Sequence, residues 1–410
     1  MNRVIIINLL IVLGLFFQSC KKDDLVETEP ILIQLNEKGK SLVNAASNFG
    51  IEVFQKTGIS ETDKKNWMIS PYSVSIVLAM TYNGANGDTK EAIENVLGIG
   101  GLSTEDVNIN YKQITDALLT VDKNVELSIA NSIWYRNTFS VLQDFIDHND
   151  NFYNAKVSAL DFDDSGAVDI INSWVAAITN QKIPSIINEI NAESIMFLIN
   201  AIYFKGVWKY QFDMSLNDFH NFYYEDGTVK QIEMMTQTAE IKQFVNEDII
   251  MVELPYGQGN WVMDLILPSD TKSANEIISD FTPVNWNNWT GALSSPDEVS
   301  ITFPPFKFDY NATLNTILTS LGMGIVFNPY SADFSKINSD GQLYISEVKH
   351  KTFIEVNEQG TEAAAATSVG IGVTSIGDNR IIFDKPFLFV IREVSTGTIM
   401  FMGKVGDPVR

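Results

Sequence analysis

The sequence predicts a single large α+β domain in which helices precede most of the strands. Helical spacing dominates before residue 125 and apolar, strand-like runs dominate after it. Neither a fixed-period repeat nor a low-complexity linker divides residues 37–410. A chain of 410 residues that is 45% hydrophobic has enough apolar material for one extended core.

The expected helices begin after a polar segment at residues 21–36. A second helix starts at Ser70-Pro71, because proline is favoured in a first helical turn and hydroxyl groups cap helix N-termini. The first helix has an apolar face with intervals of three and four residues, made by Leu42, Ala45, Ala46, Phe49 and Val53. Further helical windows lie at 89–97, 111–119, 168–179 and 311–321.

Apolar runs from Val125 onward predict strands. Gly257 to Asn260 forms a hairpin-like turn between two of them. The tail from Ile381 to Val405 is expected to form two or three buried strands. The other expected strands are Leu127–Tyr135, Ile195–Phe204, Ile249–Leu254, Trp261–Leu267 and Val299–Phe308.

The N-terminus has the layout of a signal peptide over residues 1–19. A short basic start precedes about 14 apolar residues, too few for a comfortable membrane span. Small Ser19 then precedes Cys20, as in a bacterial lipoprotein signal. That resemblance implies a mature chain that begins at Cys20, carries acyl chains there and continues as a lipidated tether over residues 20–36. An unlipidated, cleaved signal is the alternative.

The residues after Cys20, Lys21-Lys22-Asp23-Asp24, resemble the export tag of surface lipoproteins in Bacteroidetes-type envelopes. This implies a bacterial cell-envelope protein, lipid-anchored in the outer membrane or at the cell surface and facing outward, although periplasmic display stays open. A single cysteine cannot form an internal disulfide, so stability must come from packing.

The net charge of −23 argues against nucleic acid as a partner, because phosphate backbones are bound by clustered Lys and Arg. No basic run exceeds two lysines, and the window at 111–119 carries only Lys112. We therefore expect no glycosaminoglycan partner either.

Signatures of catalysis are absent from the sequence. Its three histidines form no His-Glu-x-x-His motif, and there is no Gly-x-Ser-x-Gly or Cys-x-x-Cys. We expect no enzyme, no metal and no cofactor; a hydrolase with catalytic groups scattered along the chain is the least favoured alternative.

Residues 358–376 carry the strongest signal. Every second residue from Thr361 to Val373 is small or aliphatic, which is the period of a strand with one buried face. The alternate residues from Glu362 to Thr374 are small and partly polar. However, the alanine run and three glycines weaken any commitment to a strand, and a flexible surface loop with accidental alternation is the alternative.

This segment resembles the reactive-loop hinge of inhibitory serpins. The matching residues are Glu358, Gly360, Thr361, Glu362, Ala363, Ala364, Ala365, Ala366 and Thr367. Three more motifs, at 66–73, 200–208 and 383–403, resemble other serpin signatures and occur in the family's order, so the resemblance spans residues 37–410.

The resemblance implies a serpin fold: α+β, three β-sheets, about nine helices and an exposed reactive-centre loop at about 358–380. It implies a monomeric, extracellular, single-use protease inhibitor. A target protease cleaves the loop, which then inserts as a new strand of the largest sheet and distorts the enzyme. A non-inhibitory serpin serving as a surface binding protein is the alternative.

Counting from the hinge places the cleaved bond at Thr374–Ser375, with the bonds one residue to either side left open. A small residue before the cut favours elastase-like or subtilisin-like targets, and Val373 also suits papain-like enzymes. By position, the resemblance implies a polar cluster beneath the opening strands, made by Ser70, Ser73, Asn200 and His350, and a tryptophan, Trp208, where insertion begins. Pro305 departs from the family, in which a lysine commonly faces the equivalent of Glu358.

Overall fold

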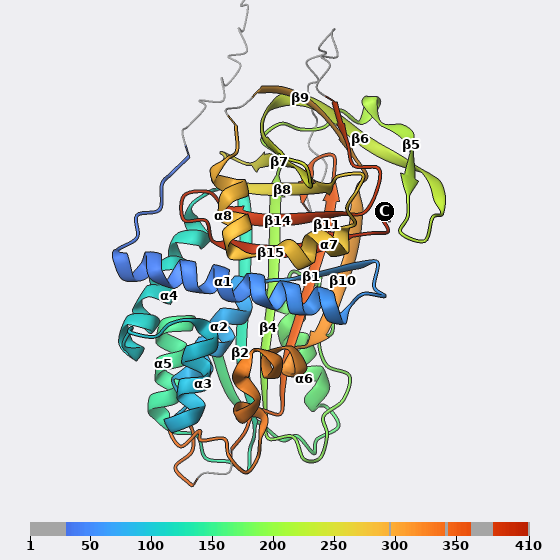
Figure 1. Ribbon diagram of the computed structural model, residues 1–410. Helices are drawn as coiled ribbons and strands as arrows, with labels where there is room; N and C mark the ends of the chain where they lie inside the picture. The colour runs from blue at the N-terminus through green and yellow to red at the C-terminus, as the bar shows by residue number, and fades with distance from the viewer. Residues whose placement is uncertain (1–29, 295–296, 341–342, 362–379, 409–410) are drawn as a thin grey trace, which may run out of the picture.

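The computed structural model describes residues 30–294, 297–340, 343–361 and 380–408, and Figure 1 shows their arrangement. These residues contain nine α-helices and three shorter helical segments. The α-helices are α1 (Glu37–Ser60), α2 (Pro71–Tyr82), α3 (Gly87–Leu97), α4 (Thr104–Thr120), α5 (Gln143–Tyr153), α6 (Ala167–Ile178), α7 (Ala274–Asp280), α8 (Pro283–Gly291) and α9 (Asn315–Leu318). The shorter segments are η1 (Met214–Leu216), η2 (Thr319–Met323) and η3 (Gly324–Phe327).

Fifteen strands form two hydrogen-bonded assemblies in the described residues. They are β1 (Asn66–Ile69), β2 (Val125–Arg136), β3 (Lys156–Leu160), β4 (Met196–Val207), β5 (Asp218–Tyr223), β6 (Val229–Val245), β7 (Ile249–Tyr256), β8 (Trp261–Pro268), β9 (Asp297–Phe303), β10 (Phe306–Thr313), β11 (Glu347–Asn357), β12 (Gly360–Thr361), β13 (Arg380–Ile382), β14 (Phe387–Glu393) and β15 (Ile399–Val405).

The six-stranded sheet has the order β10-β11-β12-β4-β2-β3. Its central strand β4 is an almost unbroken apolar run because both faces of the sheet are covered. One face packs on the main core, and the other packs on a second cluster beneath α6 that includes Trp134, Ile171 and Phe197. A strand buried on both sides has no solvent face that would impose alternation.

The nine-stranded assembly has the order β1-β15-β14-β8-β7-β6-β9-β13, with β5 paired to β6. The 17-residue strand β6 pairs in turn with β5, β9 and β7 along its length. Two of the three expected sheets therefore share β6. The predicted α+β fold class, with large sheets and about nine helices, is confirmed.

Helix α2 lies between the two assemblies and contacts both β4 and β15. All twelve of its residues are buried, which explains why its sequence is apolar on every side. Pro71 occupies the first turn, as expected. The placement of α2 brings its N-terminal residues, Ser70 and Ser73, beneath the strands of the six-stranded sheet.

Two expected elements differ from the structure. The predicted strand Val299–Phe308 is two strands, β9 and β10, because Pro304 and Pro305 interrupt it and proline has no backbone N–H for a ladder. The predicted helix at 311–321 starts instead as the end of β10, where residues 311–313 pair with β11. Its helical part is short because Gly322, with φ of 116°, breaks the regular geometry.

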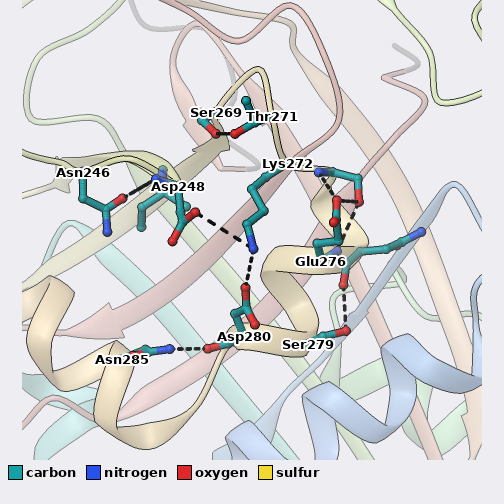
Figure 2. A network of polar contacts seen from close by, with 12 residues as sticks. Asn246, Asp248, Ser269, Thr271, Lys272, Glu276, Ser279, Asp280 and Asn285 are labelled. Atoms are coloured by element: carbon teal, nitrogen blue, oxygen red, sulfur yellow. Dashed lines mark hydrogen bonds and ion pairs between the residues drawn. The ribbon is translucent and has the colours of Figure 1, made fainter.

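A polar network links α7 and α8 to the turn between β6 and β7 of the nine-stranded assembly (Figure 2). Lys272 Nζ lies 3.1 Å from Asp280 and 4.0 Å from Asp248, which sits in the turn between β6 and β7. Ser273 and Glu276 form a reciprocal capping box at the start of α7. Such solvent-screened ion pairs contribute little net stability, so this network orients the helices more than it stabilises the fold.

Candidate functional site

The hinge of the predicted loop forms β12, a two-residue strand held between β11 and β4. Thr361 lies opposite Val356 on one side and Gly206 on the other, and Gly360 lies opposite Asn357 and Val207. Below this point β11 and β4 pair directly, in parallel, from Glu347–Phe197 to Thr352–Ile202. The sheet is thus closed along its lower half and opened at its upper end by β12.

Gly360 fits this slot because it has no side chain. Its φ of 147° is disfavoured for other residues, and a Cβ would collide with the backbone of Gly206 and Val207. The slot therefore accepts only a glycine immediately before Thr361.

Aromatic residues line the loop entrance. The Thr361 hydroxyl lies 2.6 Å from that of Tyr256, and the Tyr256 ring stacks on Trp208 with centroids 4.3 Å apart. Trp208 Nε1 donates to the carbonyl of Asn357, and its backbone N–H donates to that of Gln359. Trp208, singled out from the sequence, therefore fixes the backbone that leads into β12.

Glu358 follows β11 and is 7% exposed. Asn217 Nδ2 donates to its carboxylate at 2.7 Å, and the Phe212 N–H donates to its backbone carbonyl. Pro305, where a lysine was expected from the family pattern, is buried and offers no donor. A neutral amide thus contacts Glu358 here.

The sheet and the start of α2 together form a buried polar cluster. Ser73 Oγ donates to Asn200 Oδ1 at 2.6 Å, and Asn200 Nδ2 donates to Asn131 Oδ1 at 2.9 Å. The Ser70 N–H donates to His350 Nε2 at 3.0 Å. His350 and Asn200 lie directly opposite each other on β11 and β4, so the cluster spans the seam between these strands.

His350 is neutral in this setting. Burial lowers its pKa to about 3, and its Nε2 accepts a hydrogen bond, so the ring proton belongs on Nδ1. Within the described residues Nδ1 has no hydrogen-bond partner, nor does Ser70 Oγ. Ser70 and His350, which contact each other through the Ser70 N–H, therefore each carry an unpaired buried polar atom, a costly arrangement in a buried site.

Several predicted site residues lie outside the described residues. These are the remaining hinge residues 362–367, the predicted cleaved bond Thr374–Ser375 with both neighbouring alternatives, and the predicted lipidation residue Cys20. Among the described residues, no cluster of three or more His, Cys, Asp or Glu could bind a metal. No helix in that part of the chain is long and apolar enough to cross a membrane.

Three residues of the site carry no local sequence signal. Tyr256 and Asn131 look like ordinary strand residues, and Asn217 looks like a loop residue. Each acquires its role from a partner at least 69 positions away in the chain.

Comparisons with known proteins agree with this architecture. A family profile described as "Serpin (serine protease inhibitor)" matches residues 44–408. An uncharacterized serpin-like protein of Methanosarcina mazei is 32% identical over all of this chain and 99% of its own. Antithrombin-III of Mus musculus is 33% identical, covering 91% of this chain and 83% of its own.

Among solved structures, the native state of tengpin, a thermophilic serpin, superposes with a TM-score of 0.83. It is 35% identical and covers 93% of this chain and 97% of its own. The fold, with the hinge strand β12 held between β11 and β4 of the six-stranded sheet, agrees with this likeness. The chain belongs to the serpin family, whose members are typically protease inhibitors rather than enzymes.

Proposed function

We propose that this serpin is an inhibitor that traps serine proteases, and by the same chemistry papain-like cysteine proteases, through cleavage and insertion of its reactive loop. The observation that carries the proposal is β12, whose Gly360 and Thr361 already pair with both β11 and β4. This arrangement supports insertion because β12 already supplies the first two residues of a new strand between β11 and β4.

The strand register supports continued insertion without sliding. Extending the β12 pairing by one residue at a time brings Thr367 opposite His350 and Asn200, which already face each other across the seam. A new strand would therefore separate β11 and β4 sideways and leave their relative register unchanged. It would also bring the Thr367 hydroxyl opposite His350, whose Nδ1, like Ser70 Oγ, has no hydrogen-bond partner among the described residues.

The same register sorts the loop side chains by face. The even-numbered residues of β11, from Val348 to Val356, are buried, and the odd-numbered ones are half-exposed. Thr361 lies opposite Val356, so odd-numbered loop residues would point into the core. Those are the small or aliphatic residues from Ala363 to Val373, whereas Glu362 would face the solvent side, opposite Glu355 and Lys205.

Insertion could release enough free energy to deform a bound enzyme. About a dozen new strand residues at roughly 0.5–1.5 kcal/mol per hydrogen bond amount to on the order of 10 kcal/mol. That is comparable with the whole stability of an ordinary domain. No proline interrupts residues 358–376, so every residue can donate to a neighbouring strand.

Thr374 before the cleaved bond favours elastase-like or subtilisin-like enzymes as targets, since trypsin-like pockets require Lys or Arg and the nearest basic residue is Arg380. The test is incubation with a panel of serine and cysteine proteases, followed by denaturing electrophoresis and mass spectrometry of the released fragment. We expect SDS-stable complexes and a cut at Thr374–Ser375. Clean cleavage without complexes across the panel would instead indicate a non-inhibitory binding serpin.

We further propose that Cys20 is lipidated and anchors the protein to the outside of a bacterial envelope. Its support is the sequence around Cys20: an apolar leader, a small residue before the cysteine and Lys-Lys-Asp-Asp after it. Metabolic labelling with a fatty acid should mark the wild-type chain and leave Cys20→Ser unlabelled and released from membranes. Equal membrane retention of both chains would contradict the anchor, and protease shaving of intact cells separates surface from periplasmic display.

A further inference from the structure

The described chain begins with a segment, residues 30–36, that is fixed to the body. The Asn260 side chain makes two hydrogen bonds with the backbone of Ile31. Its Oδ1 accepts from the Ile31 N–H at 3.3 Å, and its Nδ2 donates to the Ile31 carbonyl at 2.6 Å. The Ile33 N–H donates to Ser395 Oγ at 3.0 Å. Asn36 then caps α1. The tether thus leaves the body at a defined place.

Residues 30 and 31 lie next to the turn between β7 and β8, beside the residues that lead into the reactive loop. Asn260 ends the turn between β7 and β8, and Gly259 of the same turn abuts the ring of Pro30. Tyr256, at the start of this turn, contacts the hydroxyl of Thr361. In Figure 1 residues 30–36 run from α1 along the side of the molecule toward the end where β9, the partner of β13, lies. Pro30 and the described residues that flank the loop, Thr361 and Arg380, therefore lie at the same end of the protein.

The chain length sets how far a membrane anchor can be from this point. Ten residues separate Cys20 from Pro30, and an extended chain covers at most about 3.6 Å per residue, or about 36 Å. Strand β4, with 12 residues, spans about 40 Å at 3.3 Å per residue, and its Val207 end lies at the same turn, since the Gly257 N–H donates to Val207. Only a nearly fully extended tether could bring the Met196 end to the membrane, so an anchor at Cys20 favours orientations in which the Val207 end lies nearer the membrane.

We propose that the anchored protein presents its reactive loop toward the membrane that holds it, and that its partner is a protease bound at the surface of that same membrane. The proposal rests on the lipid anchor and the loop function proposed above. A protease confined to the same surface meets the loop at a high effective concentration. A protease free in solution must instead enter the narrow space between the membrane and the serpin.

The geometry also gives the outcome of trapping. Thirteen positions separate Thr361 from Thr374, so full insertion would move the bound enzyme about 40 Å along the sheet at 3.3 Å per residue. This motion runs from the Val207 end of β4 toward its Met196 end, away from the membrane. Trapping would therefore also lift the protease off the surface where its substrates lie.

The test compares two opposite attachments of one chain to lipid vesicles. Residues 20–410 contain a single thiol, at Cys20, which a maleimide lipid can capture. The control is the double variant Cys20→Ser/Tyr330→Cys, which attaches the protein by its opposite end. Tyr330 is 96% exposed. It follows η3, which lies beside the start of β11 because the Ile345 N–H donates to the Val326 carbonyl. One elastase-like enzyme is supplied either free or coupled to the same vesicles.

The readout is total attack on the loop, counted as complex plus cleaved chain. For each attachment we take the ratio of loop attack by vesicle-bound enzyme to loop attack by free enzyme. We expect this ratio to be at least fivefold higher for attachment at Cys20 than for attachment at position 330. Inserting a Gly/Ser linker of about 40 residues before Pro30 should remove most of this preference, because a long flexible tether no longer holds the loop near the surface. Equal ratios for the two attachments would overturn the orientation.

This readout separates the orientation from the proposals on which it rests. A loop that is cleaved but never forms complexes contradicts inhibition and still reports which end faces the vesicle. A native protein without acyl chains on Cys20 would overturn both the anchor and the membrane-facing orientation.

Discussion

The side-chain hydroxyls of Thr361 and Tyr256 lie 2.6 Å apart, with Thr361 1% exposed and Tyr256 fully buried. This contact fixes the first inward-facing residue of the loop inside the sheet before any protease has acted. In the proposed inserted state Thr361 keeps the same neighbours. Its environment therefore constrains inhibition and native stability together.

Thr361→Arg should convert the inhibitor into a substrate. A guanidinium cannot be accommodated in a slot where Thr361 is almost fully buried without a large desolvation cost. The hinge should therefore stay outside the sheet and the loop should be cleaved without trapping. The measurement is the ratio of SDS-stable complex to cleaved chain, which we expect to fall more than tenfold.

Thr361→Val is the matched control, because it keeps the shape and removes only the hydroxyl. It leaves the Tyr256 hydroxyl unpaired at a cost of about 1–3 kcal/mol in stability. Complex formation should persist. Unchanged trapping by Thr361→Arg would contradict insertion at this slot.

Ala365→Glu and Ala366→Glu should differ although they are neighbours with the same change. Extending the register places Ala365 opposite Thr352 and Ile202, which are fully buried in the main core, and Ala366 opposite half-exposed Lys351 and opposite Ala201, which packs in the cluster beneath α6. A carboxylate directed into the main core should abolish trapping, whereas one beside the Lys351 ammonium should reduce it less. Complex yield with one protease measures both; equal losses would show that the loop does not follow the β12 register.

His350 should make native stability fall on acidification. Its pKa is about 3 in the folded protein and about 6.5 in an unfolded chain. Between these values the unfolded chain binds the extra proton, so the free energy of unfolding falls as pH decreases, by about 1.4 kcal/mol per pH unit. The full contribution is present above pH 6.5. Denaturant unfolding from pH 7.5 to 5 should show it as roughly 2 kcal/mol.

His350→Gln should flatten that part of the profile. Ser70→Ala is the control, because it alters the same cluster without removing a titratable group and should shift stability equally at every pH. Parallel profiles for the wild type and His350→Gln would exclude a role for His350 in acid sensitivity.

Much of the site was predictable because serpin motifs are local. The hinge residues, Trp208, Asn200 and His350 each sit in a recognisable short stretch, and the period of the loop follows from single residues. Tyr256 and Asn131 were not predictable, because only strand pairing brings them to Thr361 and Asn200. The break between β9 and β10 was predictable from Pro304-Pro305, because two prolines interrupt a strand even within an apolar run. The path of residues 30–36 along the body depends on Asn260, 229 positions from Ile31.

A buried charge network in the nine-stranded assembly supplies the last prediction. Arg392 on β14 donates through Nε to Asp264 on β8 at 2.6 Å and through Nη2 to Glu253 on β7. All three residues are at most 6% exposed. Burial raises the pKa of Asp264 to about 6, opposed by the Arg392 charge, so the carboxylate is ionised at neutral pH.

Arg392→Met should lower the free energy of unfolding by about 3–5 kcal/mol, because it removes the cation that buried Asp264 contacts and leaves buried Glu253 paired only with the half-exposed Lys242. Urea unfolding at pH 7.5 measures the loss. Lys385→Ala is the control: it breaks the pair with Asp270, whose side chain is fully exposed, and should leave stability almost unchanged. If unpaired charge is the cause, adding Asp264→Asn to Arg392→Met should restore part of the lost stability. The single variant should also regain stability relative to the wild type as pH falls, because unpaired buried carboxylates take up protons more readily than paired ones. A loss that neither the second substitution nor acidification relieves would instead indicate that Arg392 acts through packing, for example against Trp286.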